Sequence, residues 1–470
     1  MVNTVKEEST GRFRMEKKSI GFGFRGTMLI VYQFLAFSMY CSINNIGQNI
    51  HANFNQQFGW NYTSVSTIYT IVSIIAVIIQ FAIGKKIANS GKLKVFSVTF
   101  MILSAICAIG MATIKSNEML WLVVWGLAVF FSIIGATFMV STIVGQWFPR
   151  RKGTVMGIAT LAFPVINGIG LTIFGNMLNA SHGNLLFAWV PWLVLDAIGI
   201  IICLVFITEY PEQCGAFPDN DHTMTPEAAK ALMEQQAAAK KNSVWGIKNI
   251  TRTADFWLIT IPQGILLLGS VGAMTQVMAL IGQFGFVVDN APTAAGAGLL
   301  LGFAGIGCVG SWLLGVIDTK FGTKTSILIS CILMVLSAVL CFSGTVSNKA
   351  ALFIVGFACL QVFMGASSNF TVSSAAQYWR REDFPSAFSF INPLANLICA
   401  FGPMIIAGVG FTRGFHVVWV IVGVLGVIAL ICTLVFKPAR ILAKDKQYRR
   451  EAGLPEEGLS KSNAEMMGEK

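Results

Sequence analysis

Amide and hydroxyl side chains recur at intervals of three or four residues within strongly apolar stretches of this sequence. Tyr40, Asn44 and Gln48 follow this spacing in one stretch, and Ser367 and Thr371 follow it in another. Residues spaced in this way share one face of an α-helix. Polar groups among apolar side chains need hydrogen-bond partners. Each face therefore predicts either one wall of a polar cavity that binds a solute or a set of hydrogen bonds between helices.

Two asparagines occur in a repeated pattern, in which each follows a proline by three residues. These are Asn167, after Pro164, and Asn396, after Pro393. A proline inside a helix frees a backbone carbonyl and bends the chain, so each amide either faces a cavity or satisfies its own bend. With the glutamines and serines of other apolar stretches, they complete the predicted substrate-binding set, which is Tyr40, Asn44, Gln48, Asn167, Gln263, Gln276, Ser311, Ser367, Thr371 and Asn396.

Asp196 is the one acidic residue in the middle of an apolar stretch. An ionisable side chain in such a place is a functional candidate by default. Two interpretations stay open: Asp196 carries a proton that is coupled to transport, or it is a protonated carboxyl with a structural hydrogen bond.

Groups typical of metal, cofactor or enzyme chemistry are missing from the sequence. The ten cysteines include no Cys-x-x-Cys pair, and the four histidines do not cluster. No paired acids or activated nucleophile lie within the apolar stretches. The segment 305–310 matches Gly-x-Gly-x-x-Gly, but it lies inside an apolar stretch, where glycines are typical of close helix packing. We therefore expect no metal, no cofactor and no enzymatic activity.

The elements that carry these residues are predicted from the composition, in which only 12% of the 470 residues are charged and 55% are hydrophobic. Such a chain is typical of a protein that crosses the lipid bilayer many times. Twelve apolar runs are long enough to span it, near 26–50, 64–83, 95–113, 119–146, 154–177, 185–208, 256–285, 294–317, 325–344, 350–378, 386–409 and 416–436. The sequence thus predicts an all-α membrane protein with twelve transmembrane helices.

The positions of the cations predict the orientation. Thirty of the 33 Lys and Arg residues lie in the tails 1–25 and 437–470 and in the loops on the same side, whereas the opposite loops hold only Lys115, Lys349 and Arg413. Cations near span ends stay in the cytoplasm. We expect a multi-pass protein of the plasma (inner) membrane, a monomer with both termini cytoplasmic. The net charge of +11 then reflects orientation and not a nucleic-acid partner.

Internal repeats divide the spans into two similar halves, 26–208 and 256–436, which the cytoplasmic loop 209–255 separates. The Pro-x-x-Asn pattern recurs in corresponding spans, and so does a glycine-rich basic loop. The first copy of this loop contains Gly84, Gly91 and Lys92, and the second contains Gly315, Asp318, Lys320, Gly322 and Lys324. We expect both loops to act in cytoplasmic gates.

These loops and halves resemble the major facilitator superfamily. The segments 58–60, 147–153 and 211–219 are similar to the oxalate/formate antiporter and monocarboxylate porter branch. The resemblance implies a secondary active transporter that moves a mono- or dicarboxylate or a related organic acid by alternating access, as an antiporter or with protons. One departure favours an alternative, an exporter of neutral or amphipathic compounds: Ser311 occupies the position where those carriers typically have an arginine, and no predicted span contains Lys or Arg.

Overall fold

The computed structural model describes residues 21–60, 63–88, 90–115, 117–148, 151–220, 243–288, 291–380 and 382–458, as well as residues 227, 231, 234, 461, 462, 464 and 465. The side chains of 48–57, 81, 83–88, 152–153, 291 and 385 lie outside the described part, as do the remaining residues.

Six apolar spans form the first half, and two of them are interrupted. The fourth span consists of α4, η1 and α5, and the fifth consists of α6, α7, η2 and α8. The elements are α1 (Phe24–Phe58), α2 (Ser64–Ala88), α3 (Leu93–Thr113), α4 (Glu118–Ser132), η1 (Ile133–Met139), α5 (Val140–Trp147), α6 (Lys152–Ala159), α7 (Ala162–Val165), η2 (Ile166–Gly170), α8 (Leu171–Ala180) and α9 (Leu185–Phe206). Two short 3₁₀ turns follow, η3 (Pro211–Cys214) and η4 (Pro218–Asn220).

The second half has longer, less broken helices. A small hairpin of β1 and β2 lies between its first two spans, which the sequence did not predict. The elements are α11 (Ile247–Arg252), α12 (Ala254–Thr275), α13 (Val277–Gly282), β1 (Val287–Val288), β2 (Ala291–Pro292), α14 (Ala294–Phe321), α15 (Thr323–Val346), α16 (Ala350–Tyr378), α17 (Phe384–Arg413), α18 (Phe415–Val435) and α19 (Pro438–Glu451).

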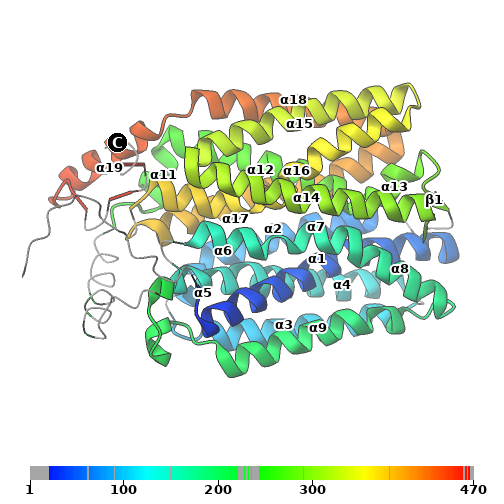
Figure 1. Cartoon of the computed structure of the whole chain (residues 1–470), viewed down its shortest axis with the longest axis horizontal. Coiled ribbons are helices and arrows are strands. Elements are labelled where there is room, and N and C mark those ends of the chain that lie inside the picture. Colours follow the sequence, from blue (N-terminus) through cyan, green and yellow to red (C-terminus); the bar gives the residue numbers. More distant parts are fainter. Residues whose placement is uncertain are drawn as a thin grey trace, which may run out of the picture.

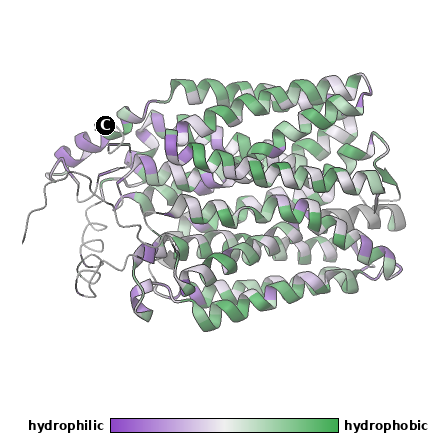
Figure 2. Ribbon diagram, viewed as in Figure 1, coloured by the Kyte–Doolittle hydropathy of each residue, from purple (hydrophilic) through white to green (hydrophobic). Residues whose placement is uncertain are grey.

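The spans lie roughly parallel in one bundle, with the first half on one side and the second half on the other (Figure 1). In the described residues, eleven helices are long and apolar enough to cross a membrane, and α2 is apolar over Ser64–Gln80. Hydrophilic residues gather at the ends of the bundle, most densely around α19 (Figure 2). The predicted membrane fold with its order of spans is confirmed.

Burial separates central helices from peripheral ones. In the most apolar part of α12, 78% of the residues are buried, compared with 28% in α9 and 33% in α18. The outer helices turn residues such as Ile201 and Val205 outward, where lipid can cover them. Residues on α12 are therefore better placed for a central site than residues on α9.

The π-helical segments η1 and η2 interrupt spans of the first half beside the bundle centre. In η1 the carbonyl of Gly135 accepts a hydrogen bond from the Ser97 hydroxyl of α3 at 3.2 Å. The segment η2 follows Pro164 and contains Asn167. Such segments shift the i→i−4 hydrogen-bond pattern and occur often at functional sites.

Candidate functional site

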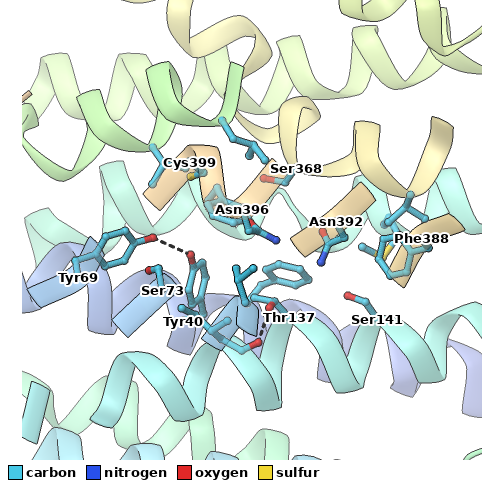
Figure 3. Close-up of a pocket in the computed structure, with 18 residues that line it drawn as sticks. Tyr40, Tyr69, Ser73, Thr137, Ser141, Ser368, Phe388, Asn392, Asn396 and Cys399 are labelled. Carbon is cyan, nitrogen blue, oxygen red and sulfur yellow. Dashed lines mark hydrogen bonds between the residues drawn. The ribbon is translucent and has the colours of Figure 1, made fainter. Parts of the chain in front are cut away.

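A cavity lies at the centre of the bundle, between the two halves (Figure 3). The helices around it come from both halves, namely α1, α2, η1, α5, α6 and α7 on one side and α12, α16 and α17 on the other. A cavity bounded in this way changes shape whenever the halves move relative to each other.

Hydroxyl groups of the first half supply one polar wall. The hydroxyls of Tyr40 and Tyr69 lie 3.3 Å apart, and Ser73 follows Tyr69 by one turn of α2. Thr137 and Ser141 are also four residues apart, on η1 and α5. Each of these hydroxyls can donate or accept a hydrogen bond.

Two amides of α17 supply the opposite wall. Asn392 and Asn396 lie four residues apart and both line the cavity (Figure 3). Asn392 accepts a hydrogen bond from Thr371 of α16 at 3.2 Å. Pro393 lies between the two asparagines, inside the helix. The amides therefore stand on a helix turn that the proline weakens.

Apolar and aromatic side chains make up most of the rest of the lining. Phe37, Phe163 and Phe388 are aromatic, and the other members are Val77, Ile133, Met156, Leu267, Val271, Val372, Cys399 and the hydroxyl-bearing Ser368. Among the described residues that line this cavity there is no Lys, Arg, His, Asp or Glu. The described lining thus offers hydrogen bonds and apolar contact, and it carries no fixed charge.

Of the predicted substrate-binding residues, Tyr40 and Asn396 line the cavity, and Thr371 contacts it through Asn392. Gln263 and Ser367 lie between α12 and α16. The Gln263 amide donates to Ser374 at 2.9 Å, and the hydroxyls of Ser367 and Ser270 lie 3.3 Å apart. These contacts match the alternative of hydrogen bonding between helices.

The other predicted residues do not line this cavity. Asn44 donates to the carbonyl of Tyr40 at 2.9 Å, and Asn167 accepts a hydrogen bond from Asn45. The buried Ser311 packs against Gly365. Gln276 is buried at the junction of α12 and α13. The side chain of Gln48 lies outside the described residues.

Asp196 is buried in α9, at 2% exposure, and it does not line the cavity. Among the described residues, neither of its carboxylate oxygens has a hydrogen-bond partner. A lone carboxyl in such surroundings is costly to leave charged. A structural hydrogen bond, one of the two interpretations of Asp196, is thus not present among the described residues.

The two predicted gate loops are described to different extents. In the second loop, Gly322 has φ +87° and so allows the tight turn between α14 and α15. The turn is bound to the end of α16, because the backbone of Thr323 donates to Gln377 at 2.7 Å and that of Lys324 donates to Tyr378 at 2.9 Å. The last turns of α14 contain Gly315, Asp318 and the exposed Lys320. The carbonyl of Asp318 accepts a hydrogen bond from the backbone of Gly322.

In the first loop, Gly84 belongs to α2, and its surroundings lie outside the described part. Gly91 has φ +67°, and Lys92 is exposed, just before α3 begins. The backbone of Lys92 donates to Ser90 at 3.2 Å.

Sequence reasoning missed six polar residues of the cavity wall, namely Tyr69, Ser73, Thr137, Ser141, Ser368 and Asn392. All except Ser368 have a polar partner four residues away in the cavity wall. The same spacing rule that selected Tyr40 would have found these five. For metals, the described residues contain no group of three or more His, Cys, Asp or Glu side chains placed to hold an ion.

A family model described as "Major Facilitator Superfamily" matches residues 33–377 and 299–463. The chain belongs to the major facilitator superfamily. This membership and the fold are those of a transporter of small molecules and not of an enzyme. The earlier expectation of a major facilitator fold in two halves is thereby confirmed.

Among relatives, this superfamily member is 26% identical over 343 residues to the glucose-6-phosphate exchanger SLC37A2 of Xenopus laevis. The alignment covers 64% of this chain and 66% of that relative. This chain is 34% identical over 96 residues to the protein of the same name in Xenopus tropicalis, which covers 20% of the chain and 18% of the relative. The alignments thus span less than two thirds of these relatives' length. The narrower resemblance to the oxalate/formate and monocarboxylate branch stays a prediction.

Solved structures of other superfamily members share the fold. The proton:xylose symporter XylE bound to 6-bromo-6-deoxy-D-glucose has a TM-score of 0.66 at 12% identity, over 86% of this chain and 94% of that one. A bacterial homologue of the human lysosomal transporter Spinster, in an inward-facing and occupied conformation, has a TM-score of 0.55 at 13% identity, over 89% and 98%.

Proposed function

We propose that this chain is a secondary active transporter that carries a small organic solute by alternating access, and that the solute is uncharged when it occupies the central cavity. Such a solute is a neutral polar compound or the protonated form of a mono- or dicarboxylic acid. The observation that carries the proposal is the cavity lining, which combines tyrosine, serine and threonine hydroxyls with two amides and contains no charged side chain among its described residues.

The energetics of charge support an uncharged solute. Moving a carboxylate from water into a site without a cation costs several kcal/mol, and hydroxyls and amides offset only part of this. A neutral solute can exchange its water hydrogen bonds for those of Tyr40, Asn392 and Asn396 at much lower cost. The phenylalanines around these groups would then cover its apolar part.

Contacts across the halves support alternating access. The Thr70 hydroxyl of α2 donates to the carbonyl of Ala400 in α17 at 2.7 Å, and the Asn369 amide of α16 donates to Thr160, beside α6, at 2.8 Å. Thr70 lies between the cavity-lining residues Tyr69 and Ser73, and Thr160, at the C-terminal end of α6, lies between the cavity-lining residues Met156 and Phe163. The two hydrogen bonds therefore join the halves beside the cavity, and each must break when the halves separate at that point.

We further propose the plasma membrane as the location, with a monomeric chain and both termini in the cytoplasm. The distribution of cations supports the orientation, since α3, α15 and α19 begin at the end of the bundle that holds most of them.

A second candidate is the exchange of organic anions, including carboxylates. It rests on the segments that resemble the carboxylate porters and on the relatives named as glucose-6-phosphate exchangers. In this case amides and helix N-termini would have to stabilise the charge.

The test is uptake into proteoliposomes that contain the purified full-length protein. A panel of labelled neutral polyols, carboxylic acids and sugar phosphates is offered with and without internal unlabelled solute, at several values of pH. Carboxylic acids that are accepted only in proportion to their protonated fraction, or neutral polyols that are accepted at all, support an uncharged solute.

Variants connect the uptake to the cavity. Asn396→Ala should lower uptake, while Asn176→Ala, at an exposed position of α8, should leave it unchanged. Fast exchange of a fully ionised sugar phosphate or dicarboxylate, with no uptake of neutral compounds, would establish the second candidate instead.

A further inference from the structure

Exposed cations are concentrated on α19 and on the neighbouring short helix α11, at one end of the bundle. We call the following side chains the basic face: Lys248, Arg252, Lys437, Arg440, Lys444 and Lys446. We propose that the basic face binds the headgroups of anionic phospholipids in the surrounding bilayer.

The basic face begins at the level where the spans end. Only Phe436 and Lys437 separate α18 from α19. The backbone of Lys437 donates to Asp255, in the first turn of α12, at 3.1 Å, and the Lys324 ammonium donates to the carbonyl of Phe436 at 2.7 Å. The start of α19 is thus fixed to the ends of α12 and α15, which places its first turns beside the lipid headgroups.

Aromatic and apolar side chains mark the same level on α11 and α12. Trp257, in the first turn of α12, is 37% exposed, and its indole N–H donates to the carbonyl of Thr251 at 2.9 Å. Tryptophan at a span end is typical of the membrane interface. Ile247 is 62% exposed next to Lys248. An exposed apolar residue beside cations suits a helix that lies in the headgroup region.

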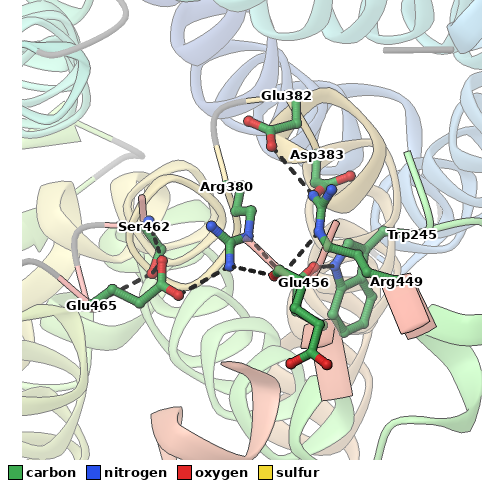
Figure 4. A network of polar contacts seen from close by, with 9 residues as sticks. Trp245, Arg380, Glu382, Asp383, Arg449, Glu456, Ser462 and Glu465 are labelled. Atoms are coloured by element: carbon green, nitrogen blue, oxygen red, sulfur yellow. Dashed lines mark hydrogen bonds and ion pairs between the residues drawn. The ribbon is translucent and has the colours of Figure 1, made fainter. Parts of the chain in front are cut away.

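A buried network of ion pairs fixes which side of α19 faces outward (Figure 4). Arg449 contacts Asp383 at 2.7 Å and Glu382 at 3.3 Å. Asp445, one turn earlier, contacts Arg380 at 2.6 Å and accepts from the Trp245 indole at 2.8 Å. These contacts come from the α16–α17 link and from the segment before α11, so this side of α19 is held against the protein.

The rest of the α19 surface is consequently left exposed, including the two flanks beside Asp445 that carry Lys444 and Lys446. Lys437, Lys444 and Lys446 are exposed, and the side chain of Arg440 is 48% exposed although it contacts Asp255 at 3.5 Å. Between residues 437 and 447 the one acid is Asp445, which the buried network already binds. Several Lys and Arg residues directly after a span attract anionic lipids by about 1 kcal/mol for each cation.

The experiment compares three forms of the full-length protein. The first is the wild type. The second combines Lys437→Gln, Lys444→Gln and Lys446→Gln. The matched control combines Lys115→Gln, Lys349→Gln and Arg413→Gln, which removes the same charge from exposed positions at the opposite end of the bundle. Binding of phosphatidylglycerol is titrated by native mass spectrometry against phosphatidylcholine, at low and high salt.

We expect the α19 variant to bind phosphatidylglycerol roughly 100-fold more weakly than the wild type, and the control to bind it as the wild type does. Salt should weaken binding to the wild type. The proposal is overturned if the α19 variant keeps its affinity, if the control loses as much, or if phosphatidylcholine binds equally well. Inorganic phosphate that displaces the lipid at equal concentration would indicate a free-anion site, which also overturns it.

A form with Lys437→Arg, Lys444→Arg and Lys446→Arg keeps the charge and guards against a folding defect. It should bind phosphatidylglycerol like the wild type, and weak binding by this form would contradict an electrostatic origin.

Discussion

At the scale of single residues, the tyrosines of α1 offer a clean comparison. The Tyr40 hydroxyl lies on the cavity wall, whereas the Tyr32 hydroxyl bonds Ser97 at 2.7 Å away from the cavity. Tyr40→Phe should raise KM for uptake roughly two- to tenfold, because one hydrogen bond contributes about 0.5–1.5 kcal/mol. Tyr32→Phe makes the same deletion and should leave KM unchanged. Initial rates in proteoliposomes measure both, and equal effects would contradict a role of Tyr40 in binding.

Asp196 permits a separate prediction about coupling. Its carboxyl is buried with no hydrogen-bond partner among the described residues. If it carries the coupled proton, Asp196→Asn should abolish the acceleration of uptake by a proton gradient, while exchange of solute across the membrane without a gradient persists. Both rates are measured in the same vesicles. Uptake by Asp196→Asn that still responds to the gradient like the wild type would remove Asp196 from the coupling step.

Spacing within a helix predicts candidates but does not select among them. Tyr40, on the predicted face of α1, lines the cavity, while Asn44 on the same face bonds the backbone one turn away. The two Pro-x-x-Asn asparagines diverge in the same way: Asn396 lines the cavity, and Asn167 bonds Asn45. The rotation and bending of each span decide such cases, and these depend on packing against neighbours that a single sequence does not contain.

At the scale of elements, glycines set how closely α14 approaches α16. A Cβ at Gly310 would lie 2.3 Å from the carbonyl oxygen of Val362, whereas a Cβ at Gly305 meets nothing within 4 Å. Close packing, as expected for this Gly-x-Gly-x-x-Gly segment, is thus found at Gly310 and not at Gly305. Gly310→Ala should destabilise the protein by about 1–3 kcal/mol, since the two helices would have to separate.

The matched variant Gly305→Ala should have little effect. Thermal unfolding in detergent, followed by tryptophan fluorescence, measures both. If Gly310→Ala unfolded at the same temperature as Gly305→Ala, the prediction would be contradicted, because α14 and α16 could then separate without loss of stability.

The stability of the folded protein should depend on pH through Asp383, at the start of α17. Burial raises the pKa of Asp383 to about 6, although Ser243 and Arg449 act in the opposite direction. The folded state therefore holds this proton more tightly than the unfolded state. The resulting contribution to stability, at most about 3 kcal/mol, is complete below the ordinary pKa of 3.8 and is lost as the pH rises through 6.

The unfolding temperature of the wild type should thus fall as the pH rises from about 4 to 7, and Asp383→Asn should make this fall smaller. Glu451→Gln, at the exposed end of α19, serves as the control and should keep the wild-type slope. Parallel curves for Asp383→Asn and the wild type would contradict this assignment.

The elements themselves were largely predictable, because each apolar run of bilayer length had to be a helix. The π-helical segments η1 and η2 and the turn at β1 and β2 were not, since such irregularities leave no mark on the apolar pattern, and the Ser97 bond to Gly135 of η1 joins residues of different spans. Nor was the long helix α19 expected within the C-terminal tail. Its buried ion pairs join residues as far apart in sequence as Arg380 and Asp445.

At the scale of the whole molecule, a native cysteine reports on the two sides of the cavity. Cys399 lines the cavity and has a free thiol, while Cys341 is buried between α15 and α16. In a variant that keeps Cys399 alone, small thiol reagents should react from each side of the membrane in turn, and bound solute should slow the reaction severalfold. A variant that keeps Cys341 alone should show no protection. Reaction of Cys399 from one side only would contradict alternating access.

The absence of charge from the described lining of the cavity also determines how the carrier responds to voltage. Moving one elementary charge through the membrane potential costs about 2.3 kcal/mol per 100 mV. When the two halves move around an empty cavity, its described lining carries no such charge through the field. The cavity lining should therefore add no voltage dependence to the return of the empty carrier, and an electrical current should arise from what the carrier binds or from the charge state of the buried Asp196.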